Sequence, residues 1–329
     1  MPDGTRQLQS FPGTCGTVTR TGTSRSDTDR PLISVITVCR NAAATLQNCI
    51  TSVMEQSYAP IEHIVIDGAS TDETGAILAR NASRLALVVS EPDRGLYDAM
   101  NKGIARARGE FVFFLNADDT FASRDALRDA MAEIARQPEA DVYYGALEIR
   151  SAQGRMVHVP PPPDQAEEEM VLGCLPHQAT LARRAVFDRT GPFDLRWRRH
   201  ADYDWWLKVM ADPALRLAQI DTVIGSFAMG GASSDLAKGQ PEVFAIQNAS
   251  PIYRSEAWDR RRIDLFQKAW LEARIEASRL REELAAPRGA LPASGRSLRQ
   301  WLVQNLPRPV LNLLLRIKRR LAGRNASGG

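Results

Sequence analysis

The feature that most constrains the fold is a regular alternation of apolar runs and amphipathic segments between residues 31 and 116. Four runs have the length and composition of buried strands: LISVITV (32–38), IEHIVID (61–67), LALVVS (85–90) and EFVFFLN (110–116). Helical spacing of apolar residues separates the first two runs, and a short helix is predicted from Leu96 to Ala107. This alternation predicts an α/β fold with a mostly parallel, doubly wound sheet flanked by helices.

Polar side chains come at or just past the ends of these predicted strands. They are Thr37, Asp67, Asn116, Asp118 and Asp119. In an open parallel sheet, ligands bind in the crevice outside the carboxyl ends of the strands. The sequence therefore predicts that these five side chains converge on one crevice.

The pair Asp118 and Asp119 follows an apolar strand directly, in the segment FVFFLNADD. A hard divalent cation can be held there by few protein oxygens, with water and a diphosphate completing its coordination. The alternative is that the pair caps the next helix, which is predicted to begin near Ser123. The first interpretation predicts Mg²⁺ or Mn²⁺ as cofactor, with Asp118 as ligand and Asp119 as a second candidate.

Three blocks of sequence carry a family resemblance. They are SVITVCRNAAATLQNCITSVMEQ, IEHIVIDGASTDET and SEPDRGLYDAMNKGIARARGEFVFFLNADD. In order and spacing they resemble the start of a family 2 glycosyltransferase of the GT-A fold, and they look most like bacterial enzymes that build exopolysaccharide or colanic-acid-like glycans. The resemblance covers about residues 31 to 235.

The resemblance implies roles for individual residues around a nucleotide-sugar donor. Asp67 would hydrogen-bond the nucleotide base, Thr37 would line the same pocket, Asp93 and Asn101 would lie along the donor, and Asp118 would ligate the metal. The acidic motif of the family usually begins with Asp, whereas this chain has Asn116, whose amide can still contact ribose or metal.

The segment HADYDWWLKV supplies a candidate catalytic base. Asp202 occupies the position of the Glu-Asp motif of the family, with Ala201 in place of Glu. Transfer with inversion needs one carboxylate to take the proton from the acceptor hydroxyl. The alternative is that Asp202 or Asp204 caps the helix that follows.

A His-Gln pair, His177 and Gln178 in LPHQATLARR, resembles a pair found in related enzymes before the acceptor-facing segment. The resemblance implies acceptor or diphosphate binding by both residues. A purely structural histidine is the alternative.

Composition and charge divide the chain into four parts: a disordered lead-in (1–30), a glycosyltransferase catalytic domain (31–245), a helical extension (246–285) and a basic amphipathic tail (286–329). Nine Lys and Arg and no acidic residues lie in the tail. Residues 296–324 are predicted to bind an anionic membrane surface; packing on the catalytic domain or a second subunit is the alternative, and no nucleic-acid recognition motif accompanies the charge.

The sequence shows no apolar run of about 18 residues and no apolar block at its start, so we expect a cytoplasmic protein, peripheral at the inner membrane face. Its predicted function is an inverting, metal-dependent glycosyltransfer from a nucleotide-diphosphate sugar to a glycan acceptor on a polyprenyl lipid, in cell-surface polysaccharide synthesis. One alternative is a non-catalytic nucleotide-sugar-binding or scaffold protein of the same fold, suggested by Asn116 and Ala201. A nucleotide-dependent oxidoreductase is a weaker one, because CRNAAAT stands where a G-x-G-x-x-G motif is needed.

Overall fold

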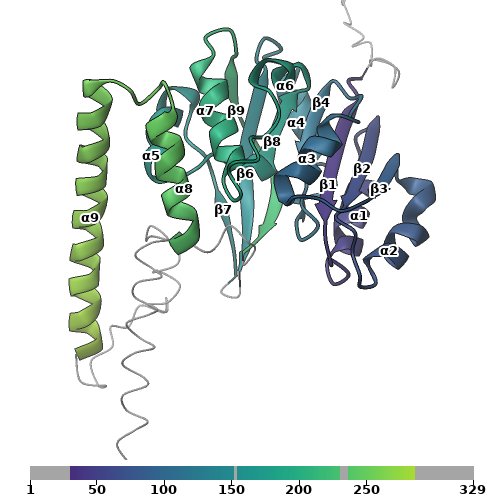
Figure 1. Ribbon diagram of the computed structural model, residues 1–329, viewed down its shortest axis with the longest axis horizontal. Helices are drawn as coiled ribbons and strands as arrows, with labels where there is room; N and C mark the ends of the chain where they lie inside the picture. The colour runs from purple at the N-terminus through teal and green to yellow at the C-terminus, as the bar shows by residue number, and fades with distance from the viewer. Residues whose placement is uncertain (1–29, 152–153, 230–235, 286–329) are drawn as a thin grey trace, which may run out of the picture. The chain divides into compact units, whose positions relative to one another are not determined.

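A computed structural model describes residues 30–151, 154–229 and 236–285 (Figure 1). The predictions for the lead-in before Arg30, for the tail 286–329 and for its membrane-binding segment 296–324 lie outside the described residues. Among the helices described, none is long and apolar enough to span a bilayer.

The first half of the chain forms the parallel part of a mixed sheet. β1 (Ile33–Cys39), β2 (Ile61–Asp67), β3 (Leu87–Ser90) and β4 (Phe111–Phe114) lie in the order β3-β2-β1-β4, and every ladder between them is parallel. The intervening helices are α1 (Leu46–Met54), α2 (Thr74–Asn81) and α3 (Leu96–Ile104). The predicted alternation, and with it the α/β fold class, is confirmed.

The second half continues the same sheet with strands of both directions. β8 (Thr180–Arg183) is antiparallel to β4 and to β6 (Val142–Ser151), while β9 (Leu217–Ala228) is parallel to β6. The short strands β5 (Thr120–Phe121) and β7 (Gly154–His158) pair antiparallel with β9 and β6. The carboxyl ends of β6 and β9 therefore share an edge with those of β1 to β4, and β8 begins at that edge.

Helices cover both faces of the sheet. Those of the second half are α4 (Ala126–Ile134), α5 (Ala166–Leu172), α6 (Ala185–Thr190) and α7 (Ala201–Ala211). Along β4, Phe111 and Phe113 pack with α4, whereas Val112 and Phe114 pack with α3, α6 and α7, as the two-residue period of a strand requires. Trp206 is fully buried against Tyr144, so Trp206→Ala should cost about 3–5 kcal/mol.

Helix α2 begins at Thr74 without a side-chain cap, and the Ser70 hydroxyl before it donates to Asp67. The helix expected near Ser123 begins at Ala126. Residue His200, rather than Asp202 or Asp204, occupies the N-cap of α7, so neither carboxylate caps it.

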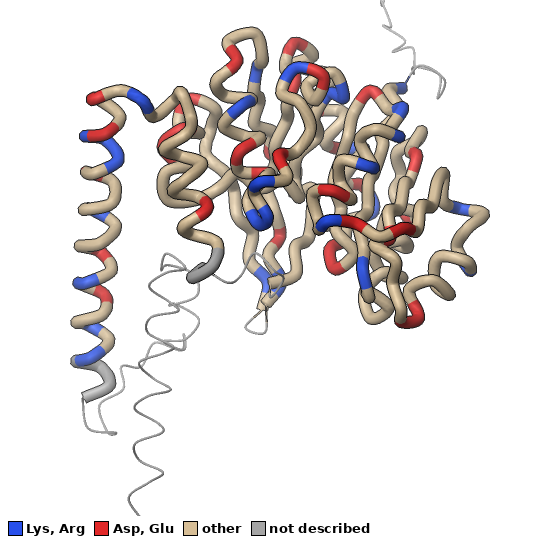
Figure 2. The backbone as a smooth tube through the Cα atoms, in the orientation of Figure 1, with Lys and Arg blue, Asp and Glu red and all other residues tan. Residues whose placement is uncertain are grey.

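The chain ends its described part in two helices, α8 (Leu236–Ala249) and α9 (Glu256–Ala285), and α9 carries charges of both signs along its length (Figure 2). The buried amide of Gln247 donates to the carbonyls of Met170 and Val171 in α5 and to the Tyr203 hydroxyl in α7. Arg262 of α9 donates to the same amide from the other side. The two helices are thus joined to the sheet-covering helices by a buried polar cluster.

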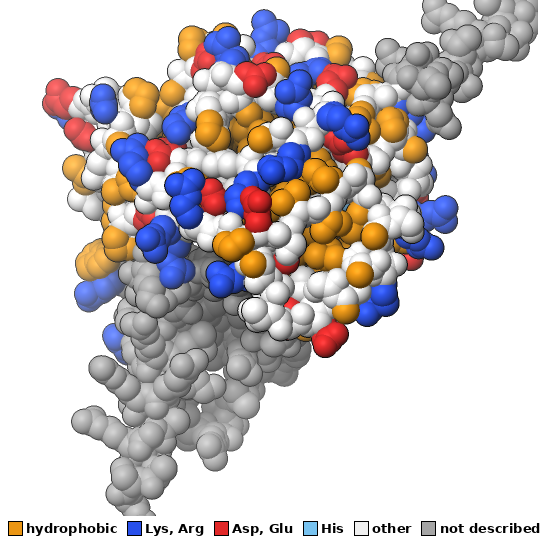
Figure 3. All heavy atoms as spheres, turned by 45° about the vertical axis from the view of Figure 1, so that its right-hand side comes forward, with side chains coloured by type: hydrophobic (Ala, Val, Ile, Leu, Met, Phe, Trp, Pro, Cys, Tyr) orange, Lys and Arg blue, Asp and Glu red, His pale blue; other side chains and the backbone are white. Residues whose placement is uncertain are grey.

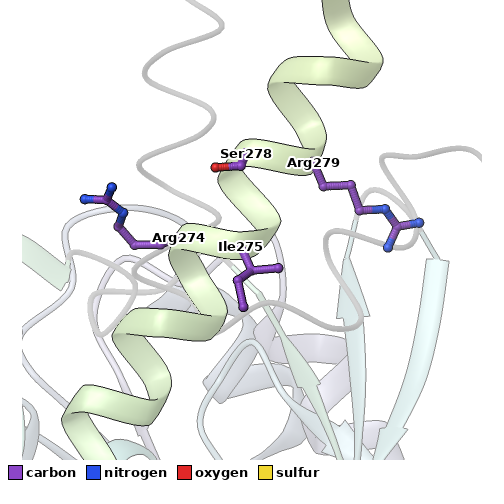
Figure 4. A pocket seen from close by; sticks show the side chains of 4 residues that line it. All are labelled: Arg274, Ile275, Ser278 and Arg279. Carbon is purple, nitrogen blue, oxygen red and sulfur yellow. The ribbon is translucent and has the colours of Figure 1, made fainter.

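The face of the protein shown in Figure 3 carries charged and apolar side chains interspersed. A shallow depression on α9 is lined by Arg274, Ile275, Ser278 and Arg279, with the two arginines extending to opposite sides of the helix (Figure 4). None of its lining residues follows a strand of the sheet, and the polar side chains singled out in the sequence lie elsewhere.

Candidate active site

Asp67 braces the loops that follow β1, β2 and β3. Its carboxylate accepts hydrogen bonds from the backbone and hydroxyl of Ser70 and from the hydroxyl of Ser90, 2.6 Å away. Asn41, after β1, donates its backbone N–H to the same Ser70 hydroxyl. Only 2% of the surface of Asp67 is exposed, and its hydrogen bonds hold the strand ends together; its contact with a nucleotide base stays a prediction.

Asp93 lies beside Gly68 at the same edge. Its Oδ1 accepts the backbone N–H of Gly95, 2.9 Å away, and its Oδ2 would stand 2.2 Å from a Cβ at position 68. Glycine is therefore required at 68 for the carboxylate to reach this position. Unlike Asp67, Asp93 remains partly exposed, so it is available to a ligand in the crevice.

Thr37 and Asn101 point their polar atoms into the protein. The Thr37 hydroxyl lies 2.9 Å from Nε2 of His63, and Thr37 has no exposed surface. The amide of Asn101 exchanges two hydrogen bonds of 2.9 Å with the backbone of Phe193. Both side chains are engaged in hydrogen bonds within the protein, and their predicted roles in donor binding stay predictions.

The two carboxylates of the acidic motif after β4, Asp118 and Asp119, differ in burial and in contacts. Asp119 is buried, and its Oδ1 accepts the backbone N–H of Ala228, so it ties the loop after β4 to the end of β9. Burial and repulsion from Asp118 raise the pKa of Asp119 to about 7. Asp118 is partly exposed. Asp119 thus has a structural contact in this loop, whereas Asp118 keeps part of its surface exposed, and the metal-binding roles of both stay predictions.

The residues present fit a divalent cation that shares its coordination with a diphosphate. Asn116 Oδ1 is buried and has no hydrogen-bond partner, and it belongs to the same loop as the Asp118 carboxylate. No group of three or more acidic, histidine or cysteine side chains among the described residues could hold a metal alone. One or two protein oxygens with phosphate and water oxygens are typical of magnesium sites.

Asp202, at the start of α7, is held by two side chains from distant parts of the chain. Its Oδ1 accepts the hydroxyl of Tyr97 in α3 at 2.6 Å, and its Oδ2 lies 2.7 Å from Nδ1 of His177. Burial opposes ionisation, but the charge and hydrogen bond of His177 and the Tyr97 hydroxyl outweigh it and lower the pKa of Asp202 to about 2. Asp202 is thus an ionised carboxylate at neutral pH.

His177 connects this carboxylate with the acidic motif. A carboxylate only accepts hydrogen bonds, so Nδ1 must donate to Asp202, which leaves Nε2 buried without a partner. His177 also acts electrostatically on Asp119. Of the predicted pair, His177 contacts Asp202 and Gln178 is half-buried, and the roles of both in acceptor or diphosphate binding stay predictions.

Two residues that sequence reasoning missed belong to this site. Tyr97 was seen only as part of a predicted helix, and burial together with the nearby Asp202 holds the pKa of its hydroxyl well above the usual value, so it remains a donor. Arg150, at the end of β6, donates to the backbone carbonyls of Asp118 and Ser226. The motif YDAMNKG could have pointed to Tyr97, but nothing near Arg150 in the sequence marks it.

The parallel half of the sheet carries acidic loops at its carboxyl edge, and helix α7 supplies the hydrogen-bonded carboxylate of Asp202. These features are those of a glycosyltransferase of the GT-A fold. The chain belongs to the family described as Glycosyl transferase family 2, whose model matches residues 34–202, just over half of the sequence.

Relatives and solved structures agree with this assignment. The chain is 32% identical over 210 residues to a PGL/p-HBAD biosynthesis glycosyltransferase of Mycobacterium bovis, covering 63% of this chain and 80% of the relative. It is 34% identical over 182 residues to an uncharacterized glycosyltransferase of Mycobacterium tuberculosis, covering 55% and 70%.

In fold it is similar to S. aureus TarS 1–349 in complex with UDP-GlcNAc (TM-score 0.53, 19% identity, 82% and 78% of the two chains). It is also similar to the mannosyltransferase PcManGT from Pyrobaculum calidifontis in complex with GDP-Man and Mn²⁺ (TM-score 0.52, 24% identity, 67% and 64%). These likenesses support the GT-A architecture.

Proposed function

We propose that this glycosyltransferase moves a sugar from a nucleotide-diphosphate donor to a glycan hydroxyl with inversion, and that Asp202 accepts the proton of that hydroxyl. The observation that carries the proposal is an ionised carboxylate held by Tyr97 and His177. Each carboxylate oxygen can accept two hydrogen bonds, so Asp202 keeps lone pairs for an acceptor.

The pKa of Asp202 shapes the chemistry. A pKa of about 2 makes the carboxylate a weak base before reaction, so proton transfer is favourable only as the acceptor oxygen bonds to the anomeric carbon and becomes acidic. General-base assistance of this kind contributes about 10²–10⁴-fold to the rate. The donor bond breaks as the new bond forms, and the nucleoside diphosphate leaves from the opposite face.

On the donor side, Asp118 and Asn116 are the residues that would hold Mg²⁺ or Mn²⁺, which would neutralise the departing diphosphate. Asp93 is the other partly exposed carboxylate at this edge and fits contact with the donor. A likeness to proteins solved with UDP-GlcNAc or with GDP-Man and Mn²⁺ supports a nucleotide-sugar donor without selecting a base.

The acceptor and the location are further parts of the proposal. The basic, amphipathic sequence 296–324 motivates a polyprenyl-linked acceptor and peripheral binding to the cytoplasmic membrane face, in surface polysaccharide synthesis. Sedimentation with anionic vesicles of the full chain, compared with a chain ending at residue 285, tests this part separately from catalysis.

The decisive experiment is calorimetric titration of UDP, GDP and their sugars, with Mn²⁺ and with a chelator, on wild type and on Asp118→Ala. We expect one diphosphate class to bind with Mn²⁺ and lose at least about tenfold in affinity in the variant, since one charge-assisted contact contributes about 1.5–3 kcal/mol. Asp129→Ala, on the exposed surface of α4, is the matched control. Binding that ignores both chelator and variant would remove Asp118 from the site.

A further inference from the structure

Glu242, on α8, accepts hydrogen bonds from the backbone that leads into α7. Its Oε1 accepts the N–H of Arg198 at 2.6 Å, and its Oε2 accepts the N–H of Arg199 at 2.8 Å and lies 3.3 Å from Nδ1 of His200. The residues contacted immediately precede Asp202, whereas Glu242 lies beyond the 34–202 region that the family model matches.

Glu242 satisfies two backbone donors of the segment that enters α7, since Arg198 and Arg199 directly precede the N-cap residue His200. The helix dipole of α7 favours a negative charge near this end. α7 has no side-chain cap of its own at His200. The side chains of Glu242 and His200 are only 16% and 20% exposed, so solvent screens this interaction less than one at the surface.

The same short segment is held from its other side by Tyr97. The Tyr97 hydroxyl lies 2.9 Å from the Arg199 carbonyl and 2.6 Å from Oδ1 of Asp202. Glu242 thus binds the N–H of Arg199, while the Tyr97 hydroxyl that holds Asp202 contacts the carbonyl of the same residue. A shift of the backbone at Arg199 must alter the Tyr97–Asp202 geometry.

The position of α8 is itself closely determined. A Cβ at Gly239 would stand 2.5 Å from Cε1 of His200, so α8 can approach α7 this closely only with glycine there. Five residues after Glu242, Gln247 binds α5 and α7 through its buried amide. Glu242 is thus presented by an element that is packed on both sides of its contact.

We infer that Glu242 is a positioning residue for the transfer reaction, which couples α8 to the orientation of Asp202 through the Arg198–His200 backbone. It acts through the backbone at the start of α7. The inference rests on the proposed role of Asp202.

A substrate-free test observes the hydrogen bond between His177 and Asp202. The Nδ1 proton of His177, assigned by its loss in His177→Gln, is measured by NMR in wild type, Glu242→Gln and Gly239→Ala. We expect its resonance to shift or broaden in both variants, because the Gln amide nitrogen faces a backbone donor and the added methyl pushes His200. Glu256→Gln, in an exposed ion pair on α9, is the control and should leave the resonance unchanged.

Kinetics separate this inference from the proposed function. Nucleoside diphosphate release is measured with UDP-GlcNAc or GDP-mannose, whichever the wild type uses, and thermal unfolding confirms folding. We expect kcat to fall about tenfold or more in Glu242→Gln with donor KM changed less than about twofold, since a misplacement of 1 Å can cost on the order of 100-fold.

An active Asp202→Asn enzyme would overturn the proposed function itself. The role of Glu242 alone would be overturned by a different pair of results. In that case Asp202→Asn is inactive, but Glu242→Gln keeps the wild-type kcat and an unshifted His177 resonance.

Discussion

The two halves of the site are built in contrasting ways. At the donor edge, Asp67, Asp93 and Asp119 bond mainly to backbone and hydroxyl groups of the strand-end loops. At the acceptor side, Asp202 depends on Tyr97, which is 105 residues away, and on His177. The donor edge is thus shaped by hydrogen bonds among strand-end loops, whereas the Asp202 carboxylate is held only when α3, the 3-10 helix His177–Ala179 before β8, and α7 have assembled.

This difference separates affinity from rate. Donor-edge variants should act on binding of the nucleotide sugar, while acceptor-side variants should act on the chemical step because Tyr97 and His177 hold the Asp202 carboxylate.

Asp202→Asn should lower the rate of sugar transfer by about 10³-fold while nucleotide affinity changes little. The amide keeps the size of the side chain but cannot take a proton. Steady-state transfer and calorimetric binding of the nucleotide give the two numbers, with Asp204→Asn, whose carboxylate pairs with Lys208, as control. Equal losses in the two variants would assign the effect to the start of α7 as a whole.

Tyr97→Phe should reduce kcat about tenfold and leave donor KM near the wild-type value, because a hydrogen bond to a charged group contributes about 1.5–3 kcal/mol. Removing the hydroxyl also removes a cause of the low Asp202 pKa, so the acid limb of the pH–rate profile should move to higher pH. An unchanged profile with reduced kcat would show that Tyr97 supports packing rather than the carboxylate.

His63 should make stability fall as the pH drops below neutral. Burial lowers the pKa of His63 in the folded protein to about 4 from 6.5, so below pH 6.5 the unfolded chain binds a proton that the folded chain does not. The contribution of the neutral, buried His63 to the free energy of unfolding is fully present above pH 6.5, and about 2 kcal/mol of this free energy is lost by pH 5. Urea unfolding at pH 7 and pH 5 measures this loss.

The control for this prediction is His63→Gln, which cannot titrate in the same range. Its free energy of unfolding should fall less between pH 7 and pH 5 than that of the wild type. Parallel losses in both proteins would transfer the effect to other groups. Donor affinity at pH 7 should be nearly unaffected, since Thr37 and His63 lie inside the sheet.

Ala69→Gly should give the smallest effect, a gain of about 0.5 kcal/mol in unfolding free energy. Ala69 follows β2 with φ 55°, a left-handed conformation that costs a Cβ-bearing residue about 1–2 kcal/mol, partly offset by the greater freedom of glycine in the unfolded chain. Denaturant unfolding measures the change. A loss of stability would mean that the Ala69 methyl makes contacts worth more than the strain.

Much of the donor half could be predicted because its signals are local. The apolar runs that became β1, β2 and β4, and the strand-end placement of Asp67 and Asp118, follow from residues adjacent in the chain. What the spacing did not predict is the hydrogen bonding of the Asp67 carboxylate, the Thr37 hydroxyl and the Asn101 amide to groups within the protein. Spacing places a residue at an edge, but neighbouring donors and acceptors decide which way its polar atoms face.

The sequence by itself determined the strand–helix alternation, the family and the positions of Asp118 and Asp202, since these depend on periodicity and motif order. Only the tertiary structure decided that Tyr97, His177 and Glu242 converge on the start of α7, and that the sheet becomes mixed after β4. Such contacts join residues tens of positions apart, and a hydrogen bond over that separation leaves no pattern in either segment. Packing of the complete chain is what brings the partners within 3 Å.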